Sequence, residues 1–434
     1  MAMLLGAKSV LNDFSVYFRD CKNENFGFYC AAGYIIFSYL RPQAIYPFLD
    51  VLPWTQLCII GGLIYGLLKS QLKYQMTHFV VLLFALSTVI SSFFSYDSDL
   101  SFRNINTVFI WMLEVLLFTS CIRTLHQLRL ILILFFLVLF KISLFGAKTW
   151  VMRGFAFKDY GIAGPRGFFE NSGELSLMMA MLVIISLSVI YQNRHIAKIY
   201  YLLPLTAFMT VLAGSSRASQ LGLVVGLFLF FILRGKFKIR YVFVGAFVCY
   251  LGFLLLPEGQ KARFTSAGED STSVSRMTYW AGGVEMFKEH PIVGVGYKCF
   301  AHYFHAYYRH TIPQGMSWGN RLEVAHNTLV EVGSEQGGIG LITYLIMYFY
   351  SFRLNIRTRK ELRKRGDAIK EHWVYRFSVG LDIANIVFII GGFFMSVAFY
   401  PYNYLMLMFS GSLNNAVQDK DGFLENKAEV SNKK

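Results

Sequence analysis

Long, uninterrupted runs of apolar residues recur along the chain and are separated by shorter polar segments. A transmembrane helix needs about 20 such residues to cross about 30 Å of hydrocarbon. The runs are continuous, whereas the strands of a membrane β-barrel alternate apolar and polar positions. We therefore predict an all-α polytopic membrane protein with about twelve transmembrane helices, or eleven if a short terminal run does not cross. The runs are residues 25–41, 53–69, 77–95, 104–122, 127–145, 172–192, 197–213, 217–234, 239–256, 327–351, 377–399 and 401–416.

The polar connections differ in charge on alternate sides of the predicted membrane. One side is basic and mostly short, as cytoplasmic loops are. It contains Lys69 and Lys73, Arg123 and Arg129, Arg194 and Lys198, residues 234–240 and residues 353–376. The opposite side receives residues 42–52, 96–103, 146–171, 214–216, 257–326 and 400–401. Both termini are then expected in the cytoplasm. Residues 146–171 and 257–326 are too long for simple connectors, which indicates a function.

This topology divides the chain into four parts. Nine helices with short loops occupy residues 1–256, a large non-cytoplasmic loop occupies 257–326, three helices occupy 327–416, and a polar cytoplasmic tail occupies 417–434. The first residues lack the pattern of a signal peptide, because charged residues follow only a brief apolar stretch. We expect the first span to remain as an uncleaved anchor.

The composition agrees with a membrane location. Of the 434 residues, 55% are hydrophobic and only 15% are charged, too few to cover a soluble domain of this size. A net charge of +15 is compatible with nucleic-acid binding, but residues 353–376 hold its densest part beside an apolar run. That position suits contact with anionic lipid headgroups, and we expect no nucleic-acid partner. The six cysteines are scattered without a CxxC pair, which argues against a disulfide framework or a zinc site.

The first candidate for chemistry is Arg217, which follows Gly214-Ser215-Ser216 at the start of an apolar run. Small residues let a ligand approach the backbone, and a helix N-terminus offers amide donors and a favourable dipole to an anion. The alternative is that Arg217 is a snorkelling anchor at the membrane interface.

Two further candidates lie in the large loop and at its end. Ser275 precedes Arg276 and is a plausible N-cap, which would put Arg276 in the first turn of a helix; a surface ion pair is the alternative. His326 stands where the chain re-enters the membrane. A histidine titrates near neutrality and can take a proton from a sugar hydroxyl, oriented by Glu331 or Glu323. An interface histidine is the alternative.

Three other patterns carry less weight. Asp97-Ser98-Asp99 has the spacing of a metal-binding DxD, but so short a match is frequent by chance. His302, His305 and His310 are interleaved with aromatic residues that indicate an interfacial belt rather than a metal site. Gly294-Val295-Gly296 lacks the context of a dinucleotide fingerprint and is predicted to be a turn.

In combination these pieces resemble the O-antigen ligase and polymerase superfamily of bacterial envelope enzymes. The resemblance covers about residues 170–345 and rests on the order in which a set of short motifs occurs. The set is Ser216-Arg217, Arg276-x-x-x-Trp280, His290-Pro291-Ile292-Val293-Gly294-Val295-Gly296, His326-Asn327-x-x-x-Glu331 and Gly337-Gly338-Ile339-Gly340. Upstream, Phe145-Gly146-Ala147-Lys148, Gly164-Pro165-Arg166-Gly167-Phe168 and Asn171 resemble the exosortase-associated putative O-glycosylation ligases. The chain departs from that subgroup at residues 170–174, where a tandem asparagine is expected.

The resemblance implies a glycosyltransferase in the bacterial inner membrane, with its active site facing the periplasm. The donor would be a glycan on undecaprenyl pyrophosphate, and the acceptor a hydroxyl of lipid A–core or another envelope glycan or protein. Arg217 and Arg276 match the family's two arginines and would hold the pyrophosphate. His326 matches its histidine, the candidate base.

Further substrate contacts are expected beside these three catalytic residues. Attack by the acceptor hydroxyl on the face opposite the pyrophosphate would invert the anomeric carbon. We expect no metal or cofactor, because arginines can stabilise the leaving group. The substrate-binding candidates are Arg166, Asn171, Ser216, Asn327 and Glu331.

Two other functions remain open. A polymerase would use the same donor and take a second lipid-linked repeat unit as acceptor. A transporter is less favoured, because transporters place ionisable residues at mid-membrane, whereas the candidates here lie at or beyond one interface.

Overall fold

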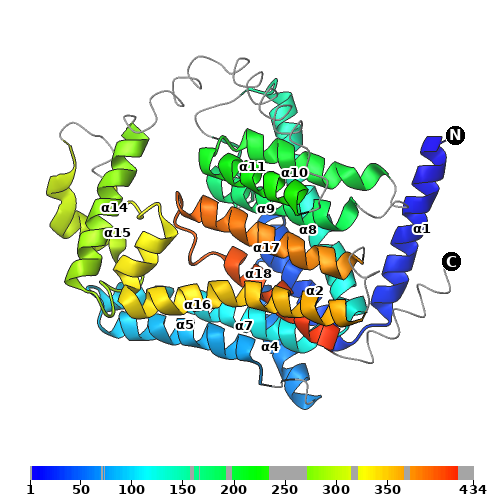
Figure 1. The fold of residues 1–434 in the computed structure, drawn as a ribbon, viewed down its shortest axis with the longest axis horizontal. Coiled ribbons are helices and arrows are strands. Elements are labelled where there is room, and N and C mark those ends of the chain that lie inside the picture. Colours follow the sequence, from blue (N-terminus) through cyan, green and yellow to red (C-terminus); the bar gives the residue numbers. More distant parts are fainter. Residues whose placement is uncertain are drawn as a thin grey trace.

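A computed structural model of the chain describes residues 2–69, 72, 74–156, 161–165, 167–191, 198–233, 271–313, 321–365 and 372–418. The regular elements among these residues are helices, which confirms the predicted all-α class (Figure 1). The longer ones are α1 (Ala2–Lys22), α2 (Phe26–Ile35), α4 (Trp54–Leu68), α5 (Met76–Phe93), α7 (Asn106–Cys121), α8 (Leu125–Met152), α9 (Ser172–Ile190), α10 (Leu202–Ala213), α11 (Arg217–Ile232), α14 (Ser271–Glu289), α16 (Thr328–Lys364), α17 (Trp373–Gly392) and α18 (Pro401–Gln418). The short ones are η1 (Ile36–Leu40), α3 (Pro42–Ile45), η2 (Pro47–Leu49), α6 (Ser98–Asn104), η3 (Lys198–Tyr201), α15 (Phe300–Tyr303), η4 (Phe304–Tyr308) and η5 (Arg309–Thr311).

Many of these helices have the length and apolarity of membrane spans, so the protein is a multi-pass membrane protein. Among the described residues seven qualify: Pro47–Leu68, Met76–Phe93, Ser98–Cys121, Leu125–Met152, Ser172–Ile190, Thr328–Lys364 and Trp373–Gly392. The apolar helices Lys198–Ala213 and Arg217–Ile232 are shorter. The predicted span 239–256 lies outside the described residues, and the count of twelve stays a prediction.

The largest differences from the prediction are at three helix ends. The helix predicted at 127–145 continues to Met152, and the one predicted at 327–351 continues to Lys364. A helix can outlast its apolar stretch because backbone hydrogen bonding does not depend on lipid. The span predicted at 377–399 is wrong at its end, because α17 stops at Gly392 and residues 393–400 form an irregular segment. Val397, Ala398 and Phe399 in this segment are buried, and apolar character of this kind does not distinguish helix from loop.

Helix α18 lies at the centre of the molecule, and nearly all its residues are buried. It packs against α7 and α8, and against α16 and α17. Helices α2, α4, α5 and α7 contact one another in one group, and α8, α9, α10, α11 and α17 form a second (Figure 1). Helix α14 contacts α16 and stands at the edge of the bundle, on the left in Figure 1.

Helix α16 is broken at Gly337, which has φ 62° and ψ −160°. The backbone groups released by the break bond to the segment after α14. Val295 N donates to Ser334 O at 2.8 Å, and Gly338 N donates to Pro291 O at 2.8 Å. A broken membrane helix is stable when neighbouring backbone satisfies its freed groups in this way. Gly294 and Gly296 have φ of 70° and 112°, which confirms the predicted turn.

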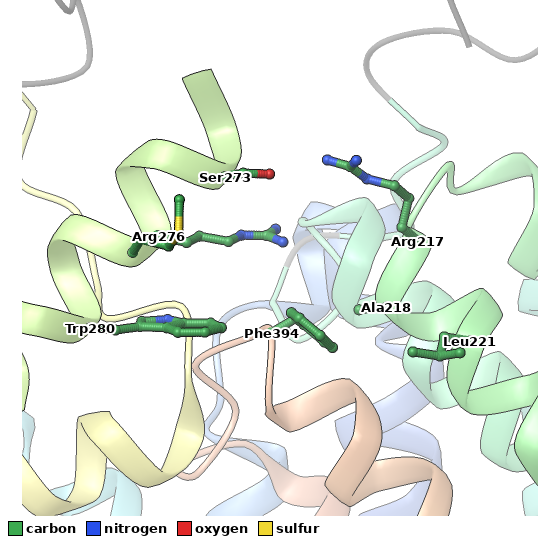
Figure 2. Close-up of a pocket in the computed structure, with 8 residues that line it drawn as sticks. Arg217, Ala218, Leu221, Ser273, Arg276, Trp280 and Phe394 are labelled. Carbon is green, nitrogen blue, oxygen red and sulfur yellow. The ribbon is translucent and has the colours of Figure 1, made fainter. Parts of the chain in front are cut away.

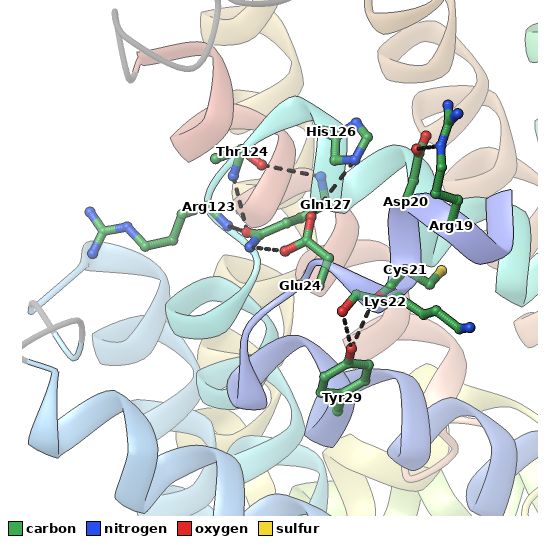
Figure 3. A network of polar contacts seen from close by, with 10 residues as sticks. All are labelled: Arg19, Asp20, Cys21, Lys22, Glu24, Tyr29, Arg123, Thr124, His126 and Gln127. Atoms are coloured by element: carbon green, nitrogen blue, oxygen red, sulfur yellow. Dashed lines mark hydrogen bonds and ion pairs between the residues drawn. The ribbon is translucent and has the colours of Figure 1, made fainter. Parts of the chain in front are cut away.

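A polar network links residues near the start of the bundle (Figure 3). The Glu24 carboxylate accepts a hydrogen bond from Gln127 Nε2 at 2.8 Å and lies 3.8 Å from His126 Nε2. Gln127 also completes a capping box with Thr124 at the start of α8. This network ties the turn between α1 and α2 to α8.

Candidate active site at converging helix N-termini

Three helices begin in side-chain caps at the same end of the bundle. Asn171 caps α9, where its Oδ1 accepts from Gly173 N at 2.8 Å. Ser216 caps α11, as predicted for a helix starting at Arg217, and its Oγ accepts from Ser219 N. Asn327 caps α16, where its Oδ1 accepts from the amides of Leu329 and Val330 at 2.9 and 3.1 Å. These caps follow from residue type, because short polar side chains satisfy the first free amides of a helix.

The three N-termini are linked to one another and to the segment 393–400. Ser219 Oγ of α11 donates to Gly173 O of α9 at 3.1 Å. Thr328 Oγ1 of α16 donates to Met395 O at 2.7 Å and accepts from Val397 N at 3.2 Å. Each N-terminus carries a partial positive charge, so their convergence favours an anion at this end of the protein.

A pocket of about 320 Å³ lies between α11 and α14 (Figure 2). Arg217 and Arg276 line it from opposite sides, and their guanidinium groups point toward each other across it. Two like charges in this arrangement repel, and an anion between them removes the repulsion through charge-assisted hydrogen bonds. The lining residues are Arg217, Ala218, Leu221, Ser273, Arg276, Met277, Trp280 and Phe394.

Helix α14 positions both Arg276 and Trp280, which are four residues apart and so share a face. The Trp280 ring packs against Phe393 and Phe394 at centroid distances of 5.4 and 6.2 Å. The predicted N-cap at Ser275 is wrong. Helix α14 is already formed at Ser271, and the Ser275 hydroxyl donates back to Thr272 O at 2.9 Å.

His326 lies beside the same helix, with its ring 6.4 Å from that of Tyr279. Its backbone has φ 51°, a left-handed conformation that non-glycine residues rarely adopt. Glu323 Oε2 lies 3.6 Å from His326 Nε2, and both side chains are about one-third exposed. Hydrogen bonding to His326 holds the pKa of Glu323 below its ordinary value, and Arg321 adds to the effect. The carboxylate is therefore ionised where it would orient a histidine base.

The remaining predicted site residues differ in burial, and one lies outside the described part of the chain. Glu331 is buried one turn into α16, where its carboxylate interacts with His326 and with Lys298. Arg166 lies outside the described residues. Sequence reasoning missed Phe394 because the apolar run around it reads as a membrane span. It also missed Lys298, which no motif singled out.

The aromatic residues near His302 were predicted to form an interfacial belt, and this is wrong for Tyr303 and Phe304. Both are buried in a cluster with Tyr279 under α14, and His290 Nε2 lies 3.0 Å from the Tyr303 hydroxyl. Interleaved aromatic side chains can pack a small outer core as readily as a membrane interface.

Asp97 and Asp99 have separate local roles. Asp97 Oδ1 caps α6 by accepting from Leu100 N at 2.9 Å, and Asp99 forms an exposed ion pair with Arg103 at 3.7 Å. Within the described part of the chain, no group of three or more histidine, cysteine or acidic side chains is arranged to hold a metal ion.

Together these features define a multi-pass helical membrane protein with a candidate anion-binding site where helix N-termini converge. Residues 202–345 match the family described as O-antigen ligase. This match confirms the resemblance of residues 202–345 to that superfamily. The matched region runs from α10 into α16 and includes Arg217, Arg276 and His326. No curated protein matches the chain. The domain supports a glycan-transferring enzyme of the ligase or polymerase type, acting on a lipid-linked glycan and an acceptor.

Proposed function

We propose that the protein transfers a glycan from undecaprenyl pyrophosphate to a hydroxyl of lipid A–core or another envelope acceptor, at the periplasmic face of the inner membrane. The observation that carries this proposal is the pocket in which Arg217 and Arg276 face each other. It includes the N-terminus of α11, and all its lining residues except Phe394 lie in the region that matches the O-antigen ligase family.

The two arginines hold the donor through its pyrophosphate. Charge grows on the leaving phosphate as the glycosidic C–O bond breaks, and two guanidinium groups can stabilise that charge with bidentate hydrogen bonds. Helix N-termini add fixed partial charges of the same sign. Leu221, Met277 and Phe394 give the pocket an apolar wall on which the lipid side of the donor can lie.

His326 acts as the base. Its ring nitrogen takes the proton of the acceptor hydroxyl while the oxygen attacks the anomeric carbon. The electron pair of the broken bond leaves with undecaprenyl pyrophosphate, and attack from the opposite face inverts the anomeric carbon. Glu323, 3.6 Å from His326, orients the ring and stabilises its protonated form. The arginines carry the leaving-group charge, so the mechanism is independent of a metal ion.

A polymerase is the second candidate, because the same domain supports it. It would use the same donor pocket and base and differ only in its acceptor, a second lipid-linked repeat unit. The assay below separates the two by offering the donor alone.

The test is glycan transfer by purified protein, with labelled lipid-linked oligosaccharide as donor and lipid A–core as acceptor. Arg217→Ala, Arg276→Ala and His326→Ala should each abolish transfer while the protein still inserts. Arg103→Ala, which removes an exposed arginine of α6, is the matched control and should stay active. Elongation of the donor without lipid A–core would indicate the polymerase. Wild-type transfer by a variant carrying both Arg276→Ala and His326→Ala would contradict the proposal.

A further inference from the structure

The segment 393–400 separates two regions of opposite charge. Phe394 lines the arginine pocket (Figure 2). At the other end of the segment, the ring of Phe399 lies 5.0 Å from Lys298 Nζ, and Tyr400 interacts with the Glu174 carboxylate. The donor pocket is therefore basic, and the region beyond the segment contains carboxylates.

Three carboxylates gather around one ammonium group in that second region. Lys298 Nζ lies within electrostatic range of Glu174, Glu331 and Glu335. Buried carboxyl groups of this kind need hydrogen-bond partners.

Two of these carboxylates have an oxygen that the fold does not use. Glu331 accepts from the backbone of Ala398, and Glu335 Oε1 accepts from Phe300 N at 3.4 Å. Oε2 of each is buried without a hydrogen-bond partner among the described residues, and so is the Tyr297 hydroxyl. Glu331 is 2% exposed and Glu335 3%. Unsatisfied polar atoms at such depth are costly unless a ligand or water completes them.

The rim of this cluster is accessible beside the predicted base. Glu174, Lys298 and Tyr400 are half-buried rather than enclosed, and so is His326. The Glu331 carboxylate interacts with both Lys298 and His326, which places the cluster next to the histidine. Ser396 Oγ, in the separating segment, has no hydrogen-bond partner among the described residues.

We propose that Glu174, Lys298, Glu331 and Tyr400, with Ser396, form the acceptor subsite, a proposal that rests on the proposed glycan transfer. The acceptor it fits is a sugar that presents hydroxyl or amino groups, which form hydrogen bonds with the unpartnered carboxyl and hydroxyl oxygens. The donor pyrophosphate stays on the arginine side of segment 393–400. The acceptor hydroxyl then reaches His326 from the other side, as inversion requires.

The test is steady-state kinetics of the purified full-length protein, with the lipid-linked donor and lipid A–core varied separately. Glu174→Gln should raise the KM for lipid A–core about tenfold or more, because it removes a charged hydrogen-bond acceptor. The KM for the donor should stay unchanged. Tyr400→Phe keeps the ring and should shift the same KM in the same direction, by less. Glu285→Gln, on the exposed face of α14, is the matched control and should leave both KM values unchanged.

The outcomes separate this inference from the proposed function. Absence of transfer by the wild-type protein would refute the function itself. Transfer by the wild type, together with Glu174→Gln and Tyr400→Phe variants that retain the wild-type KM for lipid A–core or lose donor affinity instead, would overturn the acceptor subsite alone. If Glu174→Gln does not accumulate as folded protein, Tyr400→Phe decides the question.

Discussion

Gly337 allows a direct test of how the broken helix α16 holds the site. Alanine at this position would have to adopt φ 62° and ψ −160°, a conformation that costs roughly 1–3 kcal/mol for a residue with a Cβ. The added Cβ would lie 2.6 Å from Val293 N and closer still to the Ile292 carbonyl. Overpacking of this kind costs about 1–3 kcal/mol more. We expect Gly337→Ala to lower the free energy of unfolding by about 2–6 kcal/mol.

The assay is thermal unfolding of the purified protein in detergent, with Gly333→Ala as the control. Gly333 lies one turn earlier in the same helix, and a Cβ there would meet Phe287 at an ordinary 3.5 Å. Gly333→Ala should therefore be neutral or stabilise the protein by up to about 1 kcal/mol. Equal unfolding temperatures for the two variants would refute the reasoning, because the difference rests on the backbone of residue 337 and on the segment packed against it.

Three further outcomes are expected. Replacing both Asp97 and Asp99 by asparagine should leave transfer active in EDTA, and a strict Mg²⁺ requirement would contradict the metal-independent mechanism. Glu323→Gln should unfold at a lower temperature than wild type near pH 7. Because His326 lowers the pKa of Glu323 below its ordinary 4.5, the stabilisation is present above that value and disappears as pH falls through the lowered pKa, so the two proteins should converge in acid. Asn327→Ala should cost about 1 kcal/mol of stability through loss of the α16 cap, and Asn327→Asp should retain it; equal losses would show that the cap does not contribute.

Local signals in the sequence predicted the parts of the site that depend on local structure. The start of α11 at Arg217 follows from Ser216, whose side chain caps the first amides. The end of α14 at Glu289 follows from the proline and glycines after it. The pairing of Arg217 with Arg276 came from the family resemblance, since no local rule brings two arginines 59 residues apart in the chain to one pocket.

The parts that escaped prediction depend on tertiary packing. The segment 393–400 reads as a membrane span because its residues are apolar, yet it is an irregular connection held by Thr328. The sequence did not predict the break at Gly337, because a glycine inside a helical pattern is usually tolerated without a break. Glu174 and Lys298 carry no motif, and only the fold brings them beside Glu331.

Residues with a strained backbone are concentrated at the candidate site. Among the described non-glycine residues, Arg41, Phe155, Ser215, Lys298 and His326 have positive φ, a conformation that costs about 1–2 kcal/mol per residue. Three of the five belong to the site: Ser215 precedes the cap of α11, Lys298 lies among the carboxylates, and His326 precedes the cap of α16. Strain of this kind persists only where the surroundings enforce it, and it collects where side chains must be held in one orientation. In the proposed function, this strained backbone holds Lys298 and His326 in fixed directions toward the donor and the acceptor.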